Sequence, residues 1–100
     1  EIAYTIPQTT MLSSISPNPF NIETQINYQL SVSSRVSIII YNLKGYKVKT
    51  LINERQEAGY YDMIWNGKND YDIQVNSGRY IIKMNASDYS YTNSITVLNQ

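Results

Sequence analysis

The residues best suited to chemistry lie in one polar stretch, residues 66–78, which is rich in Asn, Asp and Gly. Four of its side chains carry the oxygen ligands that Ca²⁺ prefers: Asn66, Asn69, Asp70 and Asp72. The stretch lacks the sixth-position glycine and the twelfth-position glutamate of an EF-hand loop, and no helix is expected beside it. A hairpin loop whose Asn and Asp side chains bond to nearby backbone explains the same composition. We therefore favour a loop without a metal ion.

Two carboxylate pairs could be considered for the acid–base chemistry of glycosidases: Glu54 with Glu57, and Asp70 with Asp72. Both pairs fall in polar segments without an apolar wall to raise the pKa of one member, so solvated charges are expected. The sequence contains neither histidine nor cysteine. Ser-His-Asp and Cys-His catalysis, thiolate metal sites and disulfide bonds are therefore excluded within these residues. We expect neither enzymatic activity nor a cofactor.

Length and charge narrow the classes of partner. One hundred residues correspond to one domain with a modest core. Eight basic and eight acidic residues give a net charge of zero, so nucleic acid is not an expected partner. No apolar stretch approaches the ~18 residues needed to cross a bilayer, so membrane insertion is not expected. The ten tyrosines suit half-buried strand surfaces and exposed recognition faces alike.

The hydrophobic pattern alternates with a period of two almost throughout, which predicts strands and no helix. In residues 24–30, Ile26, Tyr28 and Leu30 face one way while Gln and Asn residues face the other, as in a half-buried strand. Further strands are expected at residues 11–16, 36–41, 46–52, 60–65, from Tyr80 onward, and 89–98. Residues 53–58 are expected to form a polar loop, and residues 85–88 a turn.

Seven or so short strands at intervals of 8–12 residues predict one antiparallel β-sandwich, immunoglobulin-like or fibronectin-like. The expected core lies around Trp65, Ile38, Ile40, Tyr80 and Ile82. Trp65 could also serve as a ligand platform, but a buried position is favoured for the single tryptophan of a sandwich.

Residues 12–100 are expected to form this sandwich, and residues 1–11 a lead-in strand or a linker from an upstream domain. Residues 42–45 predict a hairpin turn in which Gly45 adopts a positive φ. Pro17 and Pro19 cannot donate to a strand ladder and so end the first strand. The segment around them is either a rigid turn or an epitope that a partner reads, and both interpretations stay open.

Five motifs follow one another in a fixed order. They are Pro17-Asn18-Pro19-Phe20-Asn21, Val36-x-Ile38-x-Ile40-Tyr41-Asn42-x-x-Gly45, Ala58-Gly59, Trp65-Asn66-Gly67 and Ser77-Gly78-Arg79-Tyr80. In this order and spacing they resemble the C-terminal sorting domains of the bacterial type IX secretion system. The immunoglobulin-like domain of the flagellar hook-capping protein is similar and belongs to the same sandwich superfamily. The resemblance covers roughly residues 12–98.

The resemblance implies a role without chemistry. Such domains end secreted proteins and are recognised by the secretion translocon after the precursor has reached the periplasm. A sortase-like surface peptidase commonly removes them. The implied partners are thus the translocon, this peptidase and an upstream cargo domain, and the implied location is secreted or at the bacterial cell surface. The implied recognition residues are Pro17, Asn18, Pro19 and Phe20 of the early motif, Gly78 and Tyr80 of the Gly-x-Tyr motif, and Ile95 and Val97 of the last strand.

The sequence departs from this family at its end and keeps two other functions open. Residues 92–100 hold no charged side chain, whereas family members often carry Lys or Arg there. A structural or assembly module, akin to the hook-cap domain, would pack against neighbouring subunits. An accessory carbohydrate-binding domain of a secreted enzyme would instead display two or three coplanar, exposed aromatic rings.

Overall fold

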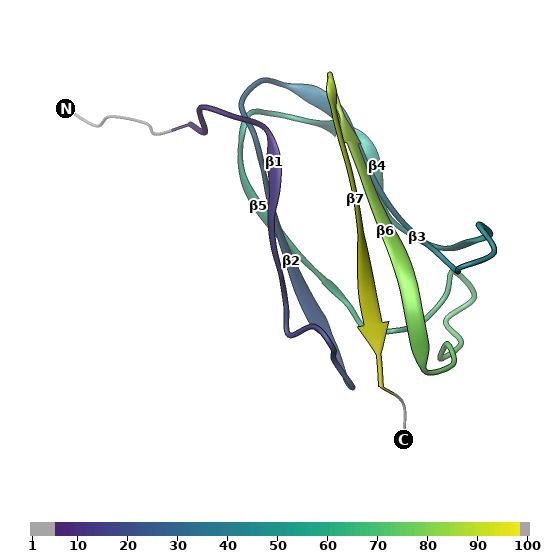
Figure 1. Ribbon diagram of the computed structural model, residues 1–100. Helices are drawn as coiled ribbons and strands as arrows, with labels where there is room; N and C mark the ends of the chain where they lie inside the picture. Colours follow the sequence, from purple (N-terminus) through teal and green to yellow (C-terminus); the bar gives the residue numbers. More distant parts are fainter. Residues whose placement is uncertain (1–5, 99–100) are drawn as a thin grey trace.

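Two antiparallel sheets pack face to face in the computed structural model, which describes residues 6–98 (Figure 1). Its seven strands are β1 (Met11–Ser16), β2 (Thr24–Leu30), β3 (Ser34–Tyr41), β4 (Lys47–Gln56), β5 (Gly59–Trp65), β6 (Gly78–Ala86) and β7 (Tyr89–Val97). One sheet has the order β1-β2-β5 and the other the order β4-β3-β6-β7. The immunoglobulin-like sandwich predicted from the sequence is confirmed. Residues 6–98 contain no helix of the length and apolarity needed to cross a membrane.

The expected strands are found, with corrections at some ends. The loop expected at residues 53–58 is wrong, because β4 continues to Gln56 by pairing with β3. Polar side chains are compatible with an edge strand whose outer side faces water, so polarity alone did not mark the strand's end. The turn expected at residues 85–88 is likewise too long, because β6 continues to Ala86. Residues 1–5 of the expected lead-in lie outside the described residues.

The core consists of the inward-facing residues of both sheets. In β3, Val36, Ile38 and Ile40 are fully buried, while the two residues between them are half-buried. Trp65 and the inward side of β6 complete the expected set, and all five expected core residues are buried. Each such side chain contributes roughly 1.5–3 kcal/mol relative to exposure. The apolar residues that recur at every second position in the sequence are therefore the ones that face the core.

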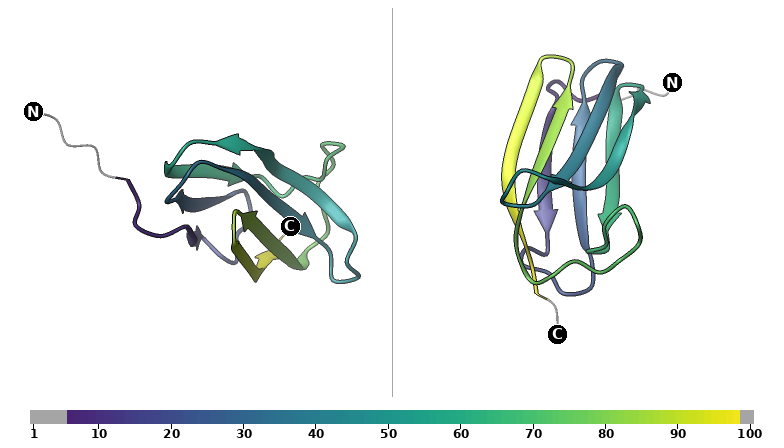
Figure 2. Two further views of the ribbon diagram at one scale, coloured as in Figure 1. Left: turned by 90° about the horizontal axis from the view of Figure 1, so that it is seen from above. Right: turned by 90° about the vertical axis from the view of Figure 1, so that its right-hand side faces the viewer.

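The hairpin between β3 and β4 forms where the sequence predicts it. Asn42 and Tyr46 pair through the bond from the Asn42 N–H to the Tyr46 carbonyl (2.9 Å), and the Gly45 N–H donates to the Asn42 carbonyl (3.0 Å). Gly45 adopts φ 92°, which the turn requires. The Asn42 Oδ1 accepts from the N–H groups of Lys44 and Tyr46. Figure 2 shows this hairpin at the same end of the sandwich as the long loop after β5.

The alternation in β3 predicts unequal costs for two neighbouring isoleucines. Ile38→Ala should lower the free energy of unfolding by about 2–5 kcal/mol because it opens a cavity between the sheets. Ile39→Ala, on the half-buried outer face, should cost about 1 kcal/mol. Urea denaturation of the two variants measures both values. Equal losses would contradict the register described here.

Candidate recognition site

The turn that contains Pro17, Asn18 and Pro19 lies beside the end of β7. The Phe20 N–H donates to the Thr96 carbonyl (3.0 Å), and the Leu98 N–H donates to the Phe20 carbonyl (2.8 Å). Phe20 and Val97 thereby form an isolated parallel bridge. β7 is the outermost strand of its sheet, so these bonds occupy its outer edge. In Figure 1 the turn and the end of β7 lie at the same end of the sandwich.

The Asn18 side chain extends this pairing along β7. Its Nδ2 donates to the Ser94 carbonyl (3.2 Å) and its Oδ1 accepts from the Thr96 N–H (2.9 Å), across 76 and 78 positions of sequence. A side-chain amide offers the same donor and acceptor as a peptide group, so it can replace a strand partner. The flanking prolines have no N–H to offer. The turn thus covers the outer edge of β7 with one side chain and one backbone residue.

Three aromatic rings connect the turn to the core. The Phe20 ring meets Trp65 edge to face at 5.4 Å, and Trp65 meets Tyr80 in the same way at 5.9 Å. The polar ends of the last two rings are satisfied, because Trp65 Nε1 donates to the Lys68 carbonyl (3.0 Å) and the Tyr80 hydroxyl to the Asn76 carbonyl (2.7 Å). Trp65 is 1% exposed, so the core interpretation of this residue is confirmed.

All eight residues that the resemblance singles out come together at this end. Gly78 lies opposite Val97 in the β6–β7 ladder and Tyr80 lies opposite Ile95, while Phe20 bridges Val97. Four of the eight are buried and cannot be touched from outside: Phe20, Tyr80, Ile95 and Val97. The other four are exposed: Pro17, Asn18, Pro19 and Gly78.

The exposed part forms a patch that we term the composite surface: Pro17, Asn18, Pro19, Gly78 and Leu98. Leu98 is 48% exposed although its N–H is bound to the turn. Leu98 was not singled out from the sequence, nor were Ser94 and Thr96, whose backbone groups hold Asn18. Backbone partners leave no signature in residue type, so no sequence signal could have found them.

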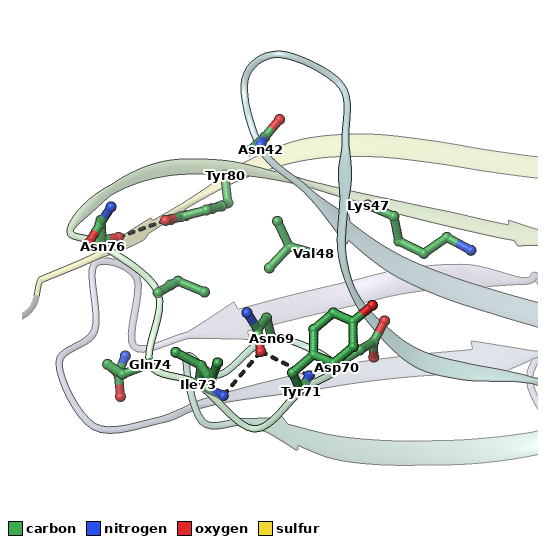
Figure 3. A pocket seen from close by; sticks show the side chains of 11 residues that line it. Asn42, Lys47, Val48, Asn69, Asp70, Tyr71, Ile73, Gln74, Asn76 and Tyr80 are labelled. Atoms are coloured by element: carbon green, nitrogen blue, oxygen red, sulfur yellow. Dashed lines mark hydrogen bonds between the residues drawn. The ribbon is translucent and has the colours of Figure 1, made fainter.

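The polar loop after β5 uses its oxygens on its own backbone (Figure 3). The Asn69 Oδ1 accepts from the N–H groups of Tyr71 (2.9 Å) and Ile73 (3.0 Å), and the Asn66 Oδ1 from that of Lys68 (3.1 Å). Among residues 6–98 no group of three or more acidic side chains is placed to hold a metal ion. These bonds support the hairpin-loop interpretation of residues 66–78.

The same loop covers the outer edge of β4. The Asp70 N–H donates to the Val48 carbonyl (3.0 Å), and the Asp70 Oδ1 accepts from the Thr50 N–H (3.1 Å). Asp70 therefore occupies backbone groups on the outer edge of β4, as Asn18 does on the outer edge of β7. The open groove of about 580 Å³ beside it is lined by both segments, including Lys47 and Tyr71.

Exposed tyrosines do not form one platform. Tyr46, Tyr60 and Tyr71 are 62–84% exposed but belong to three separate segments. Within residues 6–98 no two of these three rings stack. The two stacked tyrosine pairs of the described residues, Tyr28 with Tyr61 (5.3 Å, 12°) and Tyr89 with Tyr91 (6.3 Å, 7°), are made of buried or half-buried rings. The arrangement that the carbohydrate alternative calls for is not present in the described part of the chain.

Basic side chains gather on the outer face of the four-stranded sheet. Strand pairing and burial place five of them there: Arg35, Lys47, Arg55, Arg79 and Lys83. No strand position on that face of the sheet is Asp or Glu. The net charge of zero conceals this segregation, which depends on strand pairing and not on composition.

Comparison with known proteins identifies the fold family. The family model of the FlgD Ig-like domain matches residues 17–90. No curated protein matches the sequence. Several solved structures are similar to this chain, and three of them follow. Dimeric latent PorU from Porphyromonas gingivalis has a TM-score of 0.64 and 15% identity over 87% of this chain and 9% of PorU.

PorZ from the same bacterium has a TM-score of 0.56 and 20% identity over 85% of this chain and 11% of PorZ. FlgD from P. aeruginosa has a TM-score of 0.56 and 20% identity over 95% of this chain and 74% of FlgD. The chain therefore spans about a tenth of each Por protein but most of FlgD. At these identities the likeness shows a shared fold.

Removing the Asn18 amide should loosen the end of β7. Asn18→Ala deletes two bonds to β7, each worth about 0.5–1.5 kcal/mol, so the free energy of unfolding should fall by about 1–3 kcal/mol. Asn21→Ala is the matched control, because Asn21 is exposed and close by. Urea denaturation compares the two variants, and identical stabilities would show that the Asn18 bonds do not hold the turn.

Stability should fall as the pH rises above about 10. Burial raises the pKa of the Tyr80 hydroxyl, and burial is also the main cause that raises the pKa of Tyr28. Above the ordinary pKa of about 10, the unfolded chain releases protons that the folded chain retains, so unfolding is favoured as the pH rises. The double variant Tyr28→Phe/Tyr80→Phe should lose less stability between about pH 9 and 11. Urea denaturation across this range tests it, and equal slopes for both proteins would contradict it.

Proposed function

Because this chain belongs to the FlgD Ig-like domain family, we propose that it is a non-catalytic sorting domain that directs an attached extracellular protein through type IX secretion to the cell surface. The observation that carries the proposal is the direct hydrogen bonding between the early motif, which begins at Pro17, and the terminal strand β7. Both segments resemble recognition motifs of sorting domains, and here Asn18 and Phe20 bond directly to β7. A translocon partner would meet the two segments as one surface.

The proposed mechanism is presentation of this surface by a stable sandwich. Phe20 and Val97 are buried, so they anchor the turn and the strand and are not themselves touched. Pro17, Asn18 and Pro19 are exposed on the outside of that anchor. Rigid display lowers the entropy cost of recognition, because neither segment needs to be ordered by the partner. Recognition then depends on the fold and not on a linear terminal peptide.

Relatives support the proposal at the level of the fold. PorZ is described as an essential surface component of the type IX secretion system, and part of it shares this sandwich. The proposed partners are accordingly the translocon, a sortase-like surface peptidase and an upstream cargo domain of the same precursor. The proposed location is secreted or at the bacterial cell surface, reached through the periplasm. Since residues 92–98 carry no charge, the proposal relies on the composite surface and not on a terminal Lys or Arg.

An assembly module is the second candidate function. The observation that favours it is the extent of the match to FlgD, which covers 95% of this chain and 74% of the FlgD chain. A hook-cap-like domain would use its faces to pack against neighbouring subunits. The basic outer face of the four-stranded sheet would then be one such packing surface.

A transplant separates the two candidates. We would fuse residues 1–100 to the C-terminus of a signal-peptide-bearing reporter, in a bacterium with a type IX system, and measure reporter on intact cells. A sorting domain should deliver the reporter to the surface. Leu98→Asp, which alters the composite surface but leaves the backbone bond in place, should reduce display several-fold, whereas Val32→Asp, at a similarly exposed site outside that surface, should leave it unchanged. A stable reporter that remains in the periplasm would overturn the sorting role and favour assembly.

A further inference from the structure

Three of the four sheet edges are covered or distorted. The end of β7 is occupied by residues 18–20 and β4 by Asp70. β4 also carries two register shifts against β3, and β1 carries one against β2. The Leu12 N–H of β1 is further bound by the Tyr89 hydroxyl (3.2 Å). Coverage and bulges of this kind prevent a foreign strand from adding to an edge.

The fourth edge, that of β5, has none of these protections. Its seven residues pair with β2 in unbroken register from Gly59 to Trp65. It contains no proline and no lysine, two residues that commonly block an edge. Within residues 6–98, no loop forms a backbone bond with its outer side. β5 is therefore the one strand that offers a regular ladder of free backbone groups in the described part of the chain.

The direction of these groups follows from the neighbouring strand. The Ser13 hydroxyl on β1 donates to the Asn27 carbonyl (3.1 Å), so Asn27 directs its backbone toward β1. Backbone direction alternates along a strand, so Ile26 and Tyr28 bond toward β5, to their partners Met63 and Tyr61.

The residues between those partners must therefore turn their backbone outward. These are Tyr60, Asp62 and Ile64, whose side chains also share the outer face of the three-stranded sheet. Tyr60 is 62% and Ile64 49% exposed, and Asp62 between them is exposed as well. An added strand would bond to these three residues and place three side chains directly opposite theirs.

We propose that β5 binds an extended segment of another protein by strand addition, and that this segment reads apolar-x-basic-x-apolar. Main-chain bonds would give the affinity and the alternate side chains the selectivity. A Lys or Arg opposite Asp62 gains an opposite-charge pair, and β-branched or aromatic residues suit the positions opposite Tyr60 and Ile64.

A second copy of this chain is a poorer occupant. Two β5 strands paired about a two-fold axis at their centre would place Asp62 opposite its own copy, and like charges directly opposite are destabilising. A strand from another protein that carries Lys or Arg opposite Asp62 avoids this repulsion between like charges. Such an interaction would serve a sorting domain and an assembly module alike, so it does not depend on which role the domain has.

The test is a titration followed by NMR. The probe is the peptide acetyl-Thr-Val-Thr-Lys-Thr-Val-Thr-amide, with a second peptide in which Glu replaces Lys. The Lys peptide should shift the amide signals of Tyr60, Asp62 and Ile64 and bind about fivefold more tightly than the Glu peptide. Asp62→Lys should reverse that preference, whereas Asp88→Lys, an equal change of charge on the exposed β6–β7 turn, should not.

A proline variant tests the edge itself. Ile64→Pro removes one outward N–H but leaves the bonds to β2 intact, so the domain should fold and lose binding of the Lys peptide. The proposal is overturned if millimolar Lys peptide leaves the β5 signals unmoved, if the shifts map to another edge, or if Asp62→Lys binds both peptides as the unaltered chain does. Concentration-dependent self-association through β5 in the absence of peptide would also overturn it.

Discussion

The pairing of residues 18–20 with the outer edge of β7 is the contact on which this end of the sandwich depends. β7 is the last strand of its sheet, and without a partner its end would carry unpaired backbone groups. The bridge at Phe20 supplies that partner and also places the Phe20 ring against Trp65. Trp65 in turn packs on Tyr80, so the contact extends through three rings into the centre of the core. Surface recognition and core packing are thus parts of one arrangement.

The same device appears twice in the molecule. Asn18 and Asp70 each pair a short polar side chain, together with nearby backbone, against the outer edge of an edge strand. Both residues come from turns whose type the sequence marks clearly by Pro, Asn, Asp and Gly. The loops therefore do more than connect strands, because they close two of the four edges. The contrast with β5, which no loop covers, makes that strand stand out.

Much of the fold could be predicted because apolar residues recur at every second position of β2, β3 and β6. Ile38, Ile40 and Ile82 are buried where the period of two places them. The prediction failed for residues 53–56, where an edge strand continues although its residues change from apolar to polar. It could not reach the bonds of Asn18 to Ser94 and Thr96, because one side chain meets backbone 76–78 positions away. The resemblance singles out residues that the fold brings to one end of the sandwich, and the structure shows that half of their side chains are buried.

The most direct test of this account is amide hydrogen exchange in the unaltered domain. Thr96 and Leu98 donate to the turn, so their N–H groups should be protected as strongly as those of inner strands, although β7 is an edge strand. The outward N–H groups of Tyr60, Asp62 and Ile64 should exchange nearly as fast as an open chain. Rapid exchange at Thr96 and Leu98 would contradict the account, because the turn and the strand would then not form one surface.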